Sequence, residues 1–84
     1  MSVGVQFTGT LAPGASNRWF TWGWPADWHV VWNVVPTSPH SGAPAIEWDV
    51  EVERANDTQI TYWITVRNLS ADTADFEARY AKLN

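Results

Sequence analysis

A strict alternation of apolar and acidic residues constrains the fold of this chain more than any other feature. From Ile46 to Glu53 the sequence reads IEWDVEVE, so every second residue is a carboxylate and the residues between are apolar. Successive side chains of a β-strand point to opposite faces, and this pattern therefore predicts a strand with one packed face and one acidic, solvated face. Helical periodicity is hard to find anywhere in the chain.

A second strand is expected over Ile60–Arg67, joined to the first by the turn-forming residues of 54–58. A two-residue loop at Asn56-Asp57 would set Glu53 opposite Ile60 and mix the two faces, whereas a three-residue loop keeps apolar residues together. The sequence therefore predicts a hairpin with a three-residue loop. The expected cross-strand pairs are Val52 with Ile60, Val50 with Tyr62, and Trp48 with Ile64.

Four further strands are expected between clusters of Gly, Pro, Asn, Asp and Ser. They cover about Val3–Leu11 with an interruption at Gly9, Ser16–Trp22, Trp28–Val35 and Ala74–Lys82. Trp28–Val35 is apolar on both faces, which favours a central strand or one covered by another subunit. Ala74–Lys82 has a charged outer face, which favours an edge position. The fold class predicted is all-β, a small antiparallel β-sandwich or partly open barrel of about six strands, with residues 1–84 in a single domain.

Composition narrows the function classes without naming one. The chain has 84 residues, enough for one core, and no cysteine, which excludes disulfides and thiolate chemistry. Its net charge of -4 disfavours nucleic acid and anionic membranes as partners. The given chain contains no apolar run long enough to span a membrane and no signal-peptide pattern, so the compartment remains unknown.

Seven Trp among twelve aromatic residues are more than a core of this size needs. Tryptophan is enriched at binding surfaces because its large ring buries much area at little entropic cost. The densest stretch runs from Trp19 to His29 around a Gly/Pro turn, and indole rings beside carboxylate and imidazole groups are typical of sugar recognition. Alternatively, these rings form a hydrophobic plug or a subunit contact. The first candidate ligand site comprises Trp22, Trp24, Asp27, Trp28 and His29.

Trp63 is the centre of a second candidate site. The parity that turns Tyr62 and Ile64 inward turns Trp63 outward, where Asp49 and Glu51 lie on the same predicted face. An outward Trp between acids and hydroxyls is a possible stacking platform for a sugar. The competing interpretation is a cross-strand packing residue, or one that docks on a neighbouring protomer.

No pattern in the sequence indicates catalysis, a metal or a cofactor. The carboxylates of 47–53 are spaced by about 6.6 Å along a flat strand, whereas glycosidases need an enclosed cleft and Ca²⁺ needs converging ligands. His29 and His40 lack zinc-ligand spacing, and no nucleophile motif is present. The chain is therefore expected to be a binding protein and not an enzyme.

Two hypotheses from different classes remain. The first is a non-enzymatic, lectin-like carbohydrate-binding module that uses Trp stacking platforms, with a glycan or small saccharide as its partner. The second is a homo-oligomeric structural or interaction module whose Trp-rich face is a subunit interface, since small domains often gain stability by association. A homo-oligomer is compatible with both hypotheses.

Overall fold

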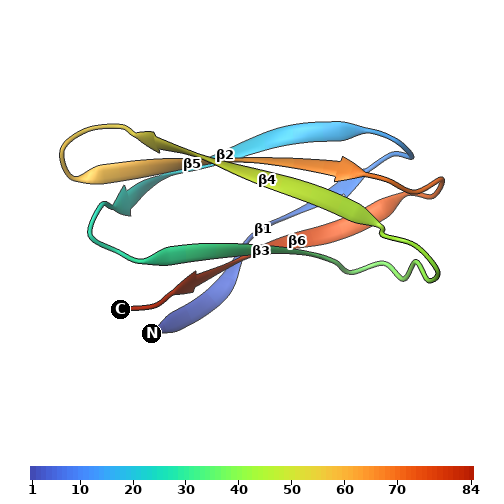
Figure 1. Cartoon of the computed structure of the whole chain (residues 1–84), viewed down its shortest axis with the longest axis horizontal. Helices are drawn as coiled ribbons and strands as arrows, with labels where there is room; N and C mark the ends of the chain where they lie inside the picture. The colour runs from blue at the N-terminus through green and yellow to red at the C-terminus, as the bar shows by residue number, and fades with distance from the viewer.

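Six β-strands and no helix make up the computed structural model, which describes residues 1–84 (Figure 1). The prediction of an all-β chain with six antiparallel strands is confirmed. The strands are β1 (Ser2–Leu11), β2 (Ser16–Pro25), β3 (Val30–Pro36), β4 (Ile46–Arg54), β5 (Gln59–Asn68) and β6 (Ala74–Lys82).

The strands form two three-stranded antiparallel sheets with the orders β1-β6-β3 and β2-β5-β4. Figure 1 shows the two sheets as separate layers, as in a small β-sandwich. Only β4 and β5 are joined as a hairpin within one sheet, and every other connection crosses from one layer to the other. The two ends of the chain lie close together, because Ser2 pairs with Lys82.

The β4–β5 hairpin keeps apolar residues on one face, but its predicted pairs are wrong by two residues. Val52 lies opposite Tyr62, Val50 opposite Ile64, and Trp48 opposite Val66. The expected three-residue loop is confirmed, but it lies one residue later in the chain than the expected pairs require. Ala55 donates its backbone N–H to the Gln59 carbonyl at 3.0 Å and leaves Asn56–Thr58 as the connection. The Asn56 side chain accepts a hydrogen bond from the Thr58 N–H at 2.9 Å. This bond closes a side-chain turn that stabilises the loop in this position.

The expected edge position of β6 is wrong, and so is the central position, one of two alternatives for β3; the other alternative, cover by another subunit, stays a prediction. β6 is the central strand of its sheet, and β3 is an edge. The charges on the outer face of β6 indicate that this face is solvated. They do not indicate whether β6 is a central or an edge strand, because that position depends on backbone pairing with its neighbours. The apolar character of β3 has two sources, since Trp32 and Val34 face the core while Val31 is exposed on the outer face.

Two strand boundaries and the position of one interruption also differ from expectation. β2 continues to Pro25, and β3 begins only at Val30, so Trp28 and His29 lie in the connection between the sheets. In β1 the pairing is unbroken at Gly9, and the shift in register falls at Gln6 instead.

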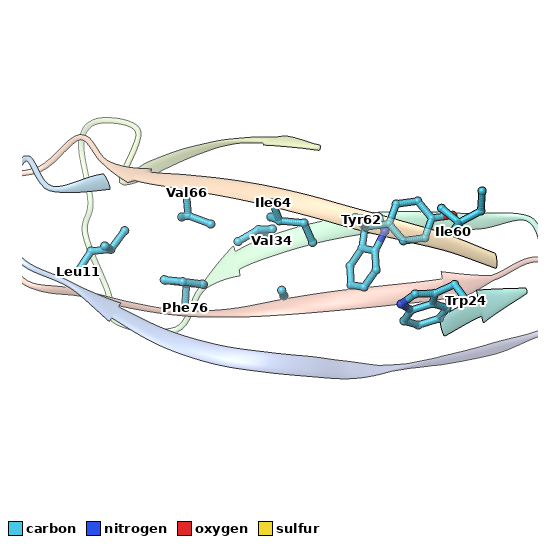
Figure 2. Close-up of a cluster of buried hydrophobic side chains, with 10 residues drawn as sticks. Leu11, Trp24, Val34, Ile60, Tyr62, Ile64, Val66 and Phe76 are labelled. Carbon is cyan, nitrogen blue, oxygen red and sulfur yellow. The ribbon is translucent and has the colours of Figure 1, made fainter. Parts of the chain in front are cut away.

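The core lies between the two sheets, as Figure 2 shows. Ile64 and Val66 from β5 are fully buried against Phe76 and Ala78 from β6. Gly9 makes room for Phe76, because a Cβ on Gly9 would approach the Phe76 ring to 2.5 Å. The Phe76 ring in turn packs edge-on against Trp19, with ring centroids 5.2 Å apart.

We expect Gly9→Ala to destabilise the fold by about 1–3 kcal/mol, because the added methyl group overpacks the core at the Phe76 ring. Urea denaturation measures this loss. Combining Gly9→Ala with Phe76→Leu removes the clash, so the two changes together should cost less than the sum of their separate costs. Strict additivity would contradict this account of Gly9.

Tyr62 packs edge-on against Trp24 and Trp32, and burial raises the pKa of its phenol above the usual value of about 10. At a pH between the pKa of Tyr62 in the unfolded chain and its higher pKa in the folded protein, the unfolded chain has lost the phenolic proton that the folded protein keeps. The free energy of unfolding should therefore fall as pH rises above about 10. Denaturation at increasing pH measures the fall, and Tyr62→Phe should make it shallower; an unchanged pH dependence in Tyr62→Phe would contradict the assignment.

Candidate functional site

A β-bulge in β2 separates two tryptophans that regular alternation would place on one face. Thr21 pairs with Tyr62, and Trp24 pairs with Ile60. The two residues Trp22 and Gly23 therefore lie opposite a single residue of β5, Thr61. The extra residue turns Trp24 into the core, where it is 8% exposed, while Trp22 stays outside and is 71% exposed. Gly23 has a φ of 79°, a left-handed conformation that glycine adopts without strain.

Trp24 is held inside the sandwich by one side-chain hydrogen bond and by ring packing. Its indole N–H donates to the hydroxyl of Thr21 at 3.1 Å, and the Gln6 amide from the opposite sheet donates to the same oxygen at 3.0 Å. Its ring also packs edge-on against Trp32. Trp24 therefore belongs to the core, and the first candidate site predicted from the sequence is divided.

The other residues of that candidate site lie in the connection between β2 and β3. The Trp28 ring packs edge-on against Trp24 and carries the Lys82 ammonium 4.0 Å above its centroid. Asp27 and His29 are exposed, and both are tied through their backbones to the side chain of Asn84. The Asp27 residue also lines a polar surface hollow of about 350 Å³ with Ala26, Arg54, Asp57 and Thr58.

A row of three aromatic rings occupies the outer face of the β2-β5-β4 sheet. Phe20 and Trp63 lie opposite each other on β2 and β5, with stacked rings whose centroids are 4.8 Å apart. Trp22 follows on β2, with its ring centroid 5.5 Å from that of Phe20. Phe20 is 52% exposed and Trp63 is half-buried. We call Trp22, Phe20 and Trp63 the aromatic row.

Charged side chains border the aromatic row. The Arg18 guanidinium lies 4.5 Å from the centroid of the Trp63 ring and donates to the Glu51 carboxylate at 2.9 Å. The Trp63 indole N–H donates to the Glu53 carboxylate at 2.8 Å. Asp49 lies opposite Thr65 on the same face and makes no side-chain hydrogen bond within the chain. Exposed pairs of this kind add little stability, but they orient Trp63.

The structure thus brings together residues from both predicted sites. Trp22 comes from the first, and Trp63, Asp49 and Glu51 come from the second. Sequence reasoning missed Phe20, although its position two residues before Trp22 on one strand places both on the same face. It also missed Arg18, whose role depends on the pairing of β2 with β5.

The chemistry available at the aromatic row is that of recognition. It offers exposed ring surface beside carboxylate acceptors and a guanidinium donor. No three acidic or imidazole groups anywhere in the chain converge as a metal site requires. No helix capable of crossing a membrane is found in the structure. Comparisons with models of protein families, with curated proteins and with solved structures found no match to this chain.

The bulge predicts opposite outcomes for two neighbouring substitutions. Trp24→Ala should cost about 3–5 kcal/mol, because it empties part of the core and leaves the Thr21 hydroxyl without its indole donor. Trp22→Ala should change the free energy of unfolding by no more than about 0.5 kcal/mol, as is usual at exposed positions. Urea denaturation compares the two variants, and equal losses would contradict the bulge geometry.

Proposed function

We propose that this chain is a non-enzymatic carbohydrate-binding module whose ligand lies on the aromatic row. The observation that supports the proposal most is the presence of three outward rings side by side, with carboxylates and a guanidinium at their border. Exposed apolar clusters rimmed by polar groups commonly mark interaction sites. Sugars match this combination because a pyranose has an apolar C–H face and hydroxyl groups around its edge.

Trp22 is the principal stacking residue in this proposal. Its ring is the most exposed of the row, and the C–H face of a sugar can cover it without displacing another side chain. Phe20 supports the Trp22 ring from beside it, which lowers the entropy lost on binding because the platform is already ordered.

The carboxylates beside the row supply hydrogen-bond acceptors for sugar hydroxyls. Glu51 and Glu53 each use one oxygen within the chain, to Arg18 and to Trp63, and the second oxygen of each carboxylate has no partner. Asp49 extends this set along the same face of β4. The internal pairs hold the acceptors in place while leaving capacity for a ligand.

The open position of the row favours an extended glycan over a small saccharide. Neither hollow on the surface includes any of its three residues. A small sugar gains most of its affinity by burial in a cleft, whereas a longer chain can place several rings along an open face. An open row also suits a protein contact, so an interface between copies is the second candidate function.

A glycan array that includes long polysaccharides, followed by titration of each hit, tests the proposal. Trp22→Ala should weaken binding by about fivefold, since stacking on one ring contributes on the order of 1 kcal/mol. Trp22→Phe retains a ring and should recover part of the affinity. Val52→Ala, which removes exposed apolar surface from β4 outside the row, is the matched control and should bind normally.

Two results would overturn the proposal. One is an array with no hit at high protein concentration, and the other is a hit whose affinity is the same for Trp22→Ala and the unmodified protein. If Trp22→Ala instead changes the oligomeric state, the row is a contact between copies.

A further inference from the structure

The four edge strands of the sandwich differ in how well they are protected from pairing with other chains. Exposed edges offer unpaired N–H and C=O groups, and proteins usually block them with charges, bulges or proline. On β4, every second residue from Glu47 to Glu53 is acidic. β2 carries the bulge at Trp22 and ends in Pro25, and β1 shifts its register at Gln6.

β3 has none of these protections along its length. It pairs with β6 from Val30 to Pro36 without a shift in register. It contains no charged residue, and its single proline is its last residue. Five of its seven residues are valine or tryptophan, which have high strand propensity. β3 is therefore the edge best suited to accept another strand.

The hydrogen-bond pattern identifies which groups of β3 are free. The His29 carbonyl accepts the Leu83 N–H, and the Thr37 N–H donates to the Asp75 carbonyl, both at 2.8 Å. Antiparallel ladders alternate, so the odd-numbered residues of β3 bond to β6, and the even-numbered ones direct their N–H and C=O outward. No backbone hydrogen bond outside the ladders reaches Val30, Trp32 or Val34.

We propose that β3 pairs antiparallel with β3 of a second copy of this chain about a two-fold axis. The pairing joins two β1-β6-β3 sheets into one continuous six-stranded sheet. In one register the two β3 strands overlap along their whole length, and the outward N–H and C=O groups of one strand lie opposite those of the other. In this register Asn33 lies opposite Asn33 of the second copy, Trp32 opposite Val34, and Val31 opposite Val35.

The side chains of β3 and its lack of charge favour this contact, in addition to the free backbone groups. Val31 is 51% exposed, and pairing would bring it against Val35 of the second copy on the outer face. β3 adds no charge of its own to oppose association of two acidic chains. On the neighbouring β4, two of the four carboxylates, those of Glu47 and Glu51, are already paired with Arg67 and Arg18, which reduces repulsion between copies.

The proposed dimer is independent of the proposed function. The aromatic row lies on the outer face of the other sheet, so pairing at β3 leaves it open. A dimer would carry two such rows, and two weak sites on one assembly can bind a repeating ligand more tightly than one.

Analytical ultracentrifugation over a range of concentrations tests the pairing. The unmodified protein should form a dimer. The double variant Val31→Lys/Val35→Lys places like charges opposite each other, and so does Val31→Glu/Val35→Glu. The dimer dissociation constant of each variant alone should therefore be at least about tenfold higher than that of the unmodified protein. Mixing the two should restore dimers, because each lysine then faces a glutamate.

A matched control separates edge pairing from packing of the sheet face. Val3→Lys/Val5→Lys places the same charges on exposed valines of the same face, but on β1 at the opposite edge, and should leave the dimer intact. Loss of the dimer in this control, an unmodified protein that stays monomeric, or mixed variants that do not associate would each overturn the proposal.

Amide hydrogen exchange on the unmodified protein gives a second test that needs no variant. The N–H groups of Trp32 and Val34 should exchange more slowly as protein concentration rises, because pairing engages them. Exchange rates that do not depend on concentration would also overturn the proposal.

Discussion

The hydroxyl of Thr21 and the bulge that follows it determine how this sandwich distributes its aromatic residues. Thr21 receives one hydrogen bond from Gln6 in the opposite sheet and another from Trp24, next to the extra residue of the bulge. A buried hydroxyl with two donors links the sheets at a place where an unpaired polar group would be costly. The same local geometry turns Trp24 inward and leaves Trp22 outward.

This distribution accounts for the large number of tryptophans in so small a chain. The space between two three-stranded sheets holds Trp24 and Trp32 as edge-on partners of Tyr62. Trp24 and Tyr62 lie at the end of the core away from Leu11 (Figure 2). Trp19, Trp28 and Trp48 are partly buried and pack against the same core. Trp22 lies instead on the open face of the β2-β5-β4 sheet, where ring surface is available for a partner.

Much of the fold could be predicted because alternation reports directly on which side chains face the core. It located β4, β5 and β6 closely and placed Trp63 on the outer face. Strand order could not be predicted in the same way, because outer-face charges do not specify backbone partners. The inward turn of Trp24 was missed because it depends on a local bulge, although Gly23 was a signal for one. Phe20 was missed although it shares the parity of Trp22.

The central claim is that the bulge places Trp22 in solvent and Trp24 in the core, and chemical modification of tryptophan in the native protein tests it most directly. Mild oxidation with a tryptophan-selective reagent, mapped residue by residue by mass spectrometry, ranks the indoles by accessibility. The account predicts that Trp22 is modified first, while Trp24 and Trp32 are protected until the protein unfolds. Modification of Trp24 at the same rate as Trp22 in the folded protein would contradict it.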